Sequence, residues 1–168
     1  MRSLKVNLDR KTSSSYDIRI GRGIVDRMLL LIAKNHKASR YVMLTDHNVG
    51  ALYGQTLMTA FTDAGLKLSV VEIPAGESHK NMTTLVNVAG QLLDLGADRS
   101  TVMIALGGGV VGDLTGFIAS VYMRSVPYIQ IPTTLVGQVD SSIGGKTAVD
   151  LPQGKNLLGT FYQPSAVF

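Results

Sequence analysis

Residues 101–113 read TVMIALGGGVVGD, and this stretch decides the fold. The segment Thr101–Leu106 is short, largely apolar and rich in branched side chains, which is typical of a strand buried on both faces of a sheet. The glycines Gly107, Gly108 and Gly109 end the strand, and the apolar run Val110–Met123 predicts a buried helix. A buried strand that passes through a glycine turn into a helix indicates a parallel sheet covered by helices.

The same alternation of strands and helices extends along the chain on both sides of this stretch. Short apolar runs predict further strands at Arg40–Thr45, Lys67–Ile73 and Tyr128–Ile131. Apolar residues at helical spacing predict helices over Ile24–Lys34, from Asn48 as the N-cap to about Ala64, and over Met82–Leu95. Because crossovers between parallel strands are right-handed, the sequence predicts an α/β fold with a Rossmann-like, doubly wound, mostly parallel sheet.

Two segments near the start predict an N-terminal β-hairpin. Leu4–Leu8 and Tyr16–Ile20 both alternate apolar and polar residues, and Lys11–Ser15 supplies the turn between them. We therefore expect the first two strands to pair with each other.

Four segments that leave the predicted strands are polar or rich in glycine. They are Asp46–Asn48, Pro74–Lys80, Gly107–Asp113 and Pro132–Thr134. In open α/β sheets, ligands bind beyond the carboxyl ends of the strands, where such segments meet. The agreement of four strand ends predicts a ligand site at this edge of the sheet.

Composition excludes several classes of protein. The chain has no cysteine, which excludes a disulfide scaffold, a thiolate zinc site and a cysteine nucleophile. A net charge of +4 and 6% aromatic residues argue against a nucleic-acid partner. No apolar stretch approaches the roughly 18 residues of a membrane span and no signal peptide is visible, so we expect a cytoplasmic protein without a membrane partner. The histidines (His36, His47 and His79) do not cluster at ligand spacing, so we expect no metal site in this chain.

Charged residues are scarce in the last 68 residues. Of 28 charged side chains, only six lie there: Asp113, Arg124, Asp140, Lys146, Asp150 and Lys155. The same segment holds ten of the 18 glycines. A glycine-rich segment with few charges indicates buried elements and a site lined by backbone.

Three motifs in these segments each have two readings. Gly107, Gly109 and Gly112 satisfy G-x-G-x-x-G, which either cradles a pyrophosphate at a helix N-terminus or packs a helix against a strand. Lys146 in Gly145-Lys146-Thr147 is either an anion anchor or a surface lysine in a hairpin; a P-loop is excluded, since Asp140 stands where its first glycine would be. The loop Glu77–Lys80 either contacts a ligand or is solvated, with Asn81 capping the next helix.

A polar cluster interrupts the apolar and glycine-rich sequence after residue 137. It consists of Gln138, Asp140, Ser141 and Ser142, followed after a turn by Lys155 and Asn156. Together with Lys146, these amines, amides, hydroxyls and a carboxylate suit a polyhydroxylated phosphate ester.

The stretches GGGVVGDLTGFIAS (107–120), YMR (122–124) and IQIPTTLVGQVDSSIGGKTAVDLPQGKNLLGTFYQP (129–164) resemble the 3-dehydroquinate synthase family. The resemblance implies an NAD-dependent enzyme of the shikimate pathway. Such an enzyme cyclises 3-deoxy-D-arabino-heptulosonate 7-phosphate to 3-dehydroquinate with elimination of phosphate. It also implies a divalent metal, zinc or cobalt, whose ligands lie in a helical C-terminal domain.

The resemblance assigns residues to each part of the site. Those implied to bind the cofactor are Asp46, Asn48, Glu77, Lys80, Gly107, Gly108, Gly109, Asp113, Thr133, Thr134, Lys146 and Lys155. Those implied to bind the sugar phosphate are Arg124, Asp140, Lys146, Lys155 and Asn156, with Lys146, Asp140 and Asn156 also catalytic. Arg124 matches an arginine that reaches into the partner's site, which implies a homodimer.

The resemblance also implies that residues 1–168 are the N-terminal NAD-binding domain and that the helical metal-binding domain is absent from this chain. We therefore expect the chain alone to be inactive. Three alternatives stay open: a sister sugar-phosphate cyclase, a metal-dependent alcohol dehydrogenase, and a non-catalytic nucleotide-binding module.

Overall fold

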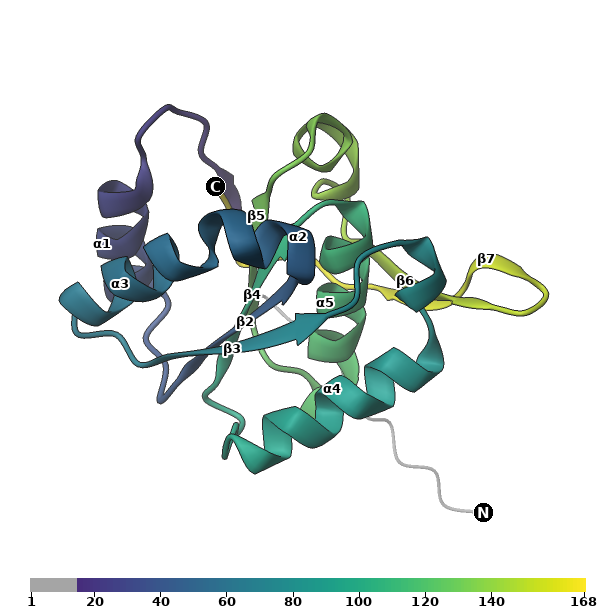
Figure 1. Ribbon diagram of the computed structural model, residues 1–168. Coiled ribbons are helices and arrows are strands. Elements are labelled where there is room, and N and C mark those ends of the chain that lie inside the picture. Colours follow the sequence, from purple (N-terminus) through teal and green to yellow (C-terminus); the bar gives the residue numbers. More distant parts are fainter. Residues whose placement is uncertain (1–14) are drawn as a thin grey trace, which may run out of the picture.

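The computed structural model describes residues 15–168, and its centre is a six-stranded sheet (Figure 1). The strands are, in spatial order, β1 (Asp17–Ile18), β8 (Ala166–Val167), β5 (Tyr128–Pro132), β4 (Val102–Gly107), β2 (Tyr41–Asp46) and β3 (Leu68–Ile73). Every neighbouring pair is parallel. The predicted Rossmann-like, doubly wound sheet is therefore confirmed.

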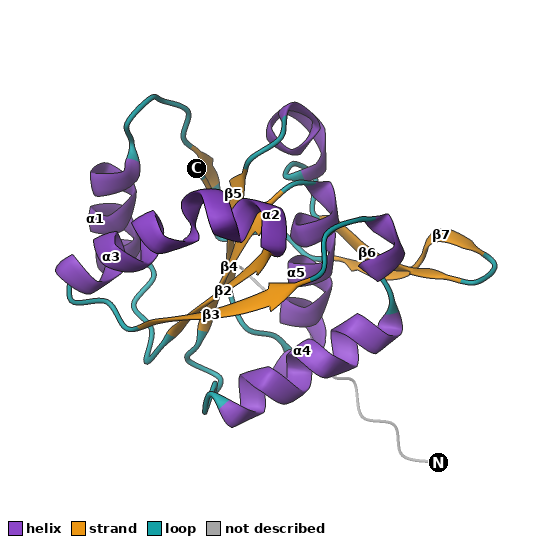
Figure 2. Ribbon diagram, in the orientation of Figure 1, coloured by secondary structure: helices purple, strands orange, loops and turns teal. Residues whose placement is uncertain are grey.

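Helices cover both faces of this sheet (Figure 2). On one face lie α1 (Val25–Asn35) and α3 (Gln55–Asp63); on the other lie α4 (Met82–Asp94) and α5 (Gly109–Val121). A short helix, α2 (His47–Val49), leads through a π-helical turn (Gly50–Gly54) into α3. Single 3₁₀ turns at Glu77–His79 and Tyr122–Arg124, and a π-helical turn at Gly137–Ser141, complete the helical elements of the described residues.

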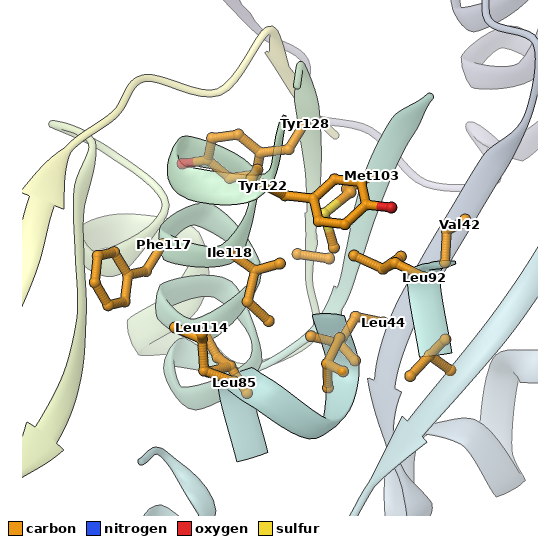
Figure 3. Packing of buried hydrophobic residues seen from close by; sticks show 14 of the residues in the cluster. Val42, Leu44, Leu85, Leu92, Met103, Leu114, Phe117, Ile118, Tyr122 and Tyr128 are labelled. Atoms are coloured by element: carbon orange, nitrogen blue, oxygen red, sulfur yellow. The ribbon is translucent and has the colours of Figure 1, made fainter. Parts of the chain in front are cut away.

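The side chains of β2 show why the strand begins with four apolar residues. Tyr41 and Met43 pack with α1 and α3, whereas Val42 and Leu44 pack with α4 and α5. Figure 3 shows Val42 and Leu44 in the core between the sheet and the helices α4 and α5, beside Leu92 of α4. All four β2 residues are buried. A segment with two covered faces has no solvated side on which to place polar residues, so the four residues from Tyr41 to Leu44 are apolar at every position.

A second, two-stranded sheet packs on the outer side of α5. It is the antiparallel hairpin of β6 (Lys146–Leu151) and β7 (Gly154–Phe161). Val149 is buried in the α4–α5 core, which fixes the hairpin to the domain. Gly144 and Gly145 have φ values of +88° and +66° in the turn before β6, a conformation that favours glycine. The hairpin reading of Lys146 is thus correct for its backbone.

Two sequence expectations need correction or restriction. The residue that caps the helix after β2 is Asp46 and not Asn48, because Asp46 Oδ1 accepts the backbone N–H groups of Asn48 (2.9 Å) and Val49 (3.1 Å). The predicted strand Leu4–Leu8 lies outside the described residues. The second predicted strand, Tyr16–Ile20, is observed as the shorter β1 (Asp17–Ile18), which pairs in parallel with β8.

Glycine substitutions should separate the packed face of α5 from the exposed face of α4. A Cβ at Gly116 would overlap Thr147 Cγ2 and lie 3.0 Å from Tyr128 Oη, whereas a Cβ at Gly90 would have no neighbour within 4 Å. We expect Gly116→Ala to lower the free energy of unfolding by about 1–3 kcal/mol through overpacking. Gly90→Ala should raise it by roughly 0.5–1 kcal/mol, because alanine favours a helix. Urea denaturation measures both, and equal effects would contradict this packing of the hairpin on α5.

Candidate functional site

The strand order places a topological switch point between β2 and β4. The chain runs from β2 outward to β3, then crosses back over β2 to β4 and continues in the other direction to β5. The helical segments that follow β2 and β4 therefore diverge to opposite faces and leave a crevice beyond the carboxyl ends of these strands. Thr45 Oγ1 donates to the carbonyl of Leu106 at 2.8 Å and holds the two strand tips together. The crevice is thus flanked by Asp46 and Gly107.

The N-terminus of α5 opens into this crevice. Gly108 is the N-cap residue, and no side chain among residues 15–168 accepts a hydrogen bond from this helix end. The first turn of the 13-residue helix therefore presents N–H groups without intrahelical partners, together with the positive end of the helix dipole. Such an end is suited to an anion.

The glycines of the G-x-G-x-x-G motif divide between two roles. A Cβ at Gly107 would lie 2.7 Å from Val111 Cβ, and one at Gly112 would lie 2.8 Å from Gln130 Oε1. These two positions are glycines because the start of α5 packs closely on the tip of β4 and on β5. Gly108 and Gly109 instead face Thr134 and Ser141 of the segment after β5. The packing reading therefore holds for Gly107 and Gly112.

The two threonines after β5 differ in their hydrogen bonds. Thr134 Oγ1 accepts the backbone N–H of Gly137 at 3.0 Å and caps the π-helical turn. Thr133 Oγ1 is buried and has no partner among the described residues, although its backbone N–H donates to the carbonyl of Gly107 at 2.9 Å. A buried hydroxyl without a partner costs free energy.

The centre of the site is the ammonium group of Lys80, a residue only 3% exposed. Lys80 Nζ donates to Asn156 Oδ1 at 2.6 Å and to Asp113 Oδ2 at 3.2 Å. It also lies 3.3 Å from Glu77 Oε1 and 3.6 Å from Asp150 Oδ1. Residues from the β3–α4 loop, from α5 and from the hairpin therefore meet on one lysine. Four of the site residues expected from the sequence (Lys80, Glu77, Asp113 and Asn156) are thus in direct contact.

Burial and charge change the pKa of both central groups. Burial raises the pKa of Asp113 above its ordinary value, against the opposing effect of the Lys80 ammonium. Burial alone would lower the pKa of Lys80, but the carboxylates of Asp113 and Glu77 outweigh it and raise that pKa. Lys80 is therefore a fixed cation at neutral pH. Lys155 Nζ, 3.5 Å from Glu77 Oε1, adds a second and more exposed positive charge.

A cavity of about 500 Å³ lies between α5, the π-helical turn and the hairpin. Among its lining residues are Asp113, Asp140, Lys146 and Asn156. Three of the implied substrate-binding residues thus share one cavity with an implied cofactor-binding residue. Lys155 lies outside it, in a neighbouring hollow with Glu77 and Asp150.

One implied site residue lies elsewhere. Arg124 lies between α5 and β5. Just after it, the carbonyl of Pro127 accepts the backbone N–H of Met103 at the amino end of β4, so this segment lies at the amino end of the sheet. Arg124 is exposed, and it belongs to three consecutive non-glycine residues, Met123, Arg124 and Ser125, with φ values of 47°, 70° and 112°. Within one copy of the chain, Arg124 is therefore at the opposite end of the domain from the crevice.

The residue that the sequence reasoning left without a role is Asp150. It contacts both Lys80 and Asn156 through a carboxylate whose side chain is 18% exposed. The sequence did offer one indication of its importance, because Asp150 is one of only six charged residues between residues 101 and 168.

The family model described as 3-dehydroquinate synthase N-terminal matches residues 70–168, which hold most of this site. The chain belongs to the 3-dehydroquinate synthase family. The 3-dehydroquinate synthase of Latilactobacillus sakei is 48% identical over 167 residues, which are 99% of this chain and 46% of that protein. The chain thus spans about half the length of this curated relative.

Two solved structures of sugar-phosphate cyclases share the fold. A 2-deoxy-scyllo-inosose synthase complexed with carbaglucose-6-phosphate, NAD⁺ and Co²⁺ is 29% identical, with a TM-score of 0.84 over 90% of this chain and 41% of that one. The 2-epi-5-epi-valiolone synthase of Streptomyces hygroscopicus, with NAD⁺ and Zn²⁺ bound, is 33% identical, with a TM-score of 0.81 over 96% and 44%. The resemblance found in the sequence is confirmed at the level of the family.

Two further findings concern the described part of the chain. Across residues 15–168, no three His, Asp or Glu side chains are grouped so that they could hold a metal ion. No helix in the same range is long and apolar enough to cross a bilayer.

Removal of the Lys80 charge should make stability depend strongly on pH. In Lys80→Met, the carboxylates of Glu77, Asp113 and Asp150 lose their shared counter-charge, and we expect a loss of about 3 kcal/mol in the free energy of unfolding at pH 7. The pKa of Asp113, already raised, should rise further, so the folded variant takes up protons that its unfolded chain does not. Its stability should therefore increase as the pH falls from 7 towards 5.

Denaturation of the variant and the unchanged chain at several pH values measures this effect. Lys67→Met removes the same charge at an exposed position and serves as the control. A deficit in Lys80→Met that does not shrink below pH 6 would contradict the electrostatic reading.

Proposed function

We propose that this chain binds NAD in the crevice between β2 and β4, as the cofactor domain of a 3-dehydroquinate synthase. The observation that carries the proposal is the open N-terminus of α5 at the switch point, beside the buried, unpartnered hydroxyl of Thr133. An anionic pyrophosphate fits the helix end, and a ligand oxygen or N–H fits Thr133. NAD bound in both sugar-phosphate cyclases at 29% and 33% identity supports the same proposal.

The residues around the crevice suit the separate parts of the cofactor. Gly108 and Gly109 let the pyrophosphate approach the backbone, and Asp46 with Asn48 flanks the adenosine half at the tip of β2. Three carboxylates (Glu77, Asp113 and Asp150) surround the single positive charge of Lys80, so this cluster is net negative. It therefore favours the cationic nicotinamide ring and the ribose hydroxyls over phosphate. When bound, NAD supplies a hydride acceptor.

An acidic residue at the start of α5 tests the cofactor site without weakening the helix. Gly109→Asp places a negative charge at the first helical position, which favours the helix dipole but repels a pyrophosphate. We expect the NAD affinity of the chain to fall at least about tenfold, while the free energy of unfolding changes by less than roughly 1 kcal/mol. Calorimetric titration with NAD and urea denaturation give the two quantities.

Gln91→Glu is the matched control, because it adds the same charge at an exposed position near the far end of α4. Equal NAD binding by Gly109→Asp and the unchanged chain would refute the proposed location. If the unchanged chain shows no binding at millimolar NAD, the non-catalytic reading is favoured instead.

We further propose that the cavity beside α5 holds part of the sugar phosphate. Lys146 would bind its anionic end, Asn156 and Asp140 its hydroxyls, and Lys155 would complete the positive charge. Arg124 would serve the site of a second copy in a homodimer, since it is exposed on a strained turn at the opposite end of its own domain. The described residues do not fit a metal ion. We also propose a cytoplasmic location.

The proposed reaction is the cyclisation of 3-deoxy-D-arabino-heptulosonate 7-phosphate to 3-dehydroquinate. The chain spans 46% of its curated relative, and we expect no turnover from the 168 residues by themselves. An assay of the purified chain with the sugar phosphate, NAD and Zn²⁺ or Co²⁺ measures this directly. Formation of dehydroquinate would contradict the expectation. The similarity to two sister cyclases favours one alternative, a carbocycle from another sugar phosphate, and identification of the product from each substrate would distinguish the two.

A further inference from the structure

Asp150 is the one charged residue of the segment 101–168 that neither the cofactor nor the substrate assignment uses. It lies in β6 at an irregularity of the hairpin: Val149 pairs with Leu158 and Leu151 pairs with Gly154, whereas Asp150 has no partner in the register. Between these two pairs β6 has one residue, Asp150, whereas β7 has three, residues 155–157, so the extra residues of the irregularity lie in β7. Asp150 therefore has no partner in the ladder, and Asn156 is one of the three residues opposite it.

Asp150 contacts the β3–α4 loop through its backbone and β7 through its side chain. Its N–H donates to the carbonyl of Lys80 at 2.7 Å, and it forms an isolated parallel bridge with Asn81. Its Oδ1 accepts the backbone N–H of Asn156 at 2.8 Å and lies 3.6 Å from Lys80 Nζ. One aspartate thus connects the two segments that form the Lys80–Asn156 contact.

The backbone of Asn156 shows what this connection maintains. Asn156 has a φ of +57°, in the left-handed region that a non-glycine residue adopts at some cost. A charge-assisted hydrogen bond to its N–H offsets that cost. In this conformation Asn156 Oδ1 lies 2.6 Å from Lys80 Nζ.

The contact with Lys80 also determines which end of the Asn156 amide is engaged. A lysine ammonium can only donate hydrogen bonds, so it takes the oxygen of the amide and leaves the Nδ2 group with its two donors. Asn156 lines the cavity beside α5. A donor in that position suits a hydroxyl or phosphate oxygen and is poorly suited to a second ammonium.

We infer that Asp150 is a positioning residue: it holds Asn156 in its left-handed conformation so that the amide oxygen meets Lys80 and the amide nitrogen serves the ligand. The value of this geometry for binding rests on the proposed function, whereas the geometry itself is independent of it. The two are therefore tested separately.

The local geometry is tested by hydrogen exchange at the backbone amide of Asn156. In Asp150→Ala this amide loses its acceptor, and we expect its exchange to accelerate at least about tenfold. Asp150→Asn keeps an oxygen at the same place and should restore most of the protection. Asp94→Ala and Asp94→Asn make the same changes at an exposed position of α4 and should leave the Asn156 amide as it is. Unchanged exchange in Asp150→Ala, or equal acceleration at amides throughout the fold, would overturn the inference.

The consequence for the site is tested by calorimetric titration of the same variants with 3-deoxy-D-arabino-heptulosonate 7-phosphate, the ligand proposed for Asn156. We expect Asp150→Ala to weaken binding of the sugar phosphate by about tenfold and Asp150→Asn by less than about threefold, in the order of the exchange rates. Equal affinities of Asp150→Ala and the unchanged chain would also overturn the inference. If the unchanged chain binds no sugar phosphate, the proposed substrate site fails, and the exchange measurement alone decides the role of Asp150.

Discussion

The buried ammonium of Lys80 is the interaction on which the arrangement of the site depends. A lysine that is 3% exposed can stay charged only if carboxylates and other acceptors surround it, and here they come from separate parts of the chain. Glu77 lies in the same loop, Asp113 in α5, and Asp150 with Asn156 in the hairpin. Because each partner would leave an uncompensated charge if it moved away, the lysine restricts the loop, the helix and the hairpin to one relative arrangement.

This constraint explains why the elements around the site could be predicted less well than the sheet. The strands are specified locally, since apolar residues without alternation indicate a segment covered on both faces, as Tyr41, Val42, Met43 and Leu44 show. The contacts of Lys80 join residues 33 and 76 positions apart, and no local pattern encodes such pairs. The lack of a ladder partner for Asp150 depends on the register of β6 with β7, which is a property of two strands together. The cap of α2 was missed for a smaller reason: Asp46 and Asn48 are both good N-cap residues, and only the backbone decides between them.

The glycine motif was ambiguous in the sequence because close packing and ligand approach require the same residue. The structure separates the positions by their neighbours. Gly107 and Gly112 lie against Val111 and Gln130, whereas Gly108 and Gly109 lie close to Thr134 and Ser141 of the segment after β5. Gly116 extends the packed face of α5 to the hairpin. The helix whose N-terminus opens into the crevice thus packs closely on β5 and on the hairpin, because glycines stand at the contact positions.

Part of the scarcity of charge after residue 100 follows from the same architecture. The segment supplies two central strands and a buried helix, which expose few residues, whereas β7 of the hairpin is largely exposed. A charge that is buried in such a segment must have a partner or a ligand, because desolvation would otherwise disfavour it. Asp113 and Asp150 have Lys80, and Lys155 has Glu77. Lys146 and Asp140 line the cavity without an ion pair in the described part of the chain, and Arg124 projects from a strained turn. These three side chains are exposed, so water can solvate them. Their proposed roles therefore rest on position: Lys146 and Asp140 line the cavity, and Arg124 stands on the strained turn.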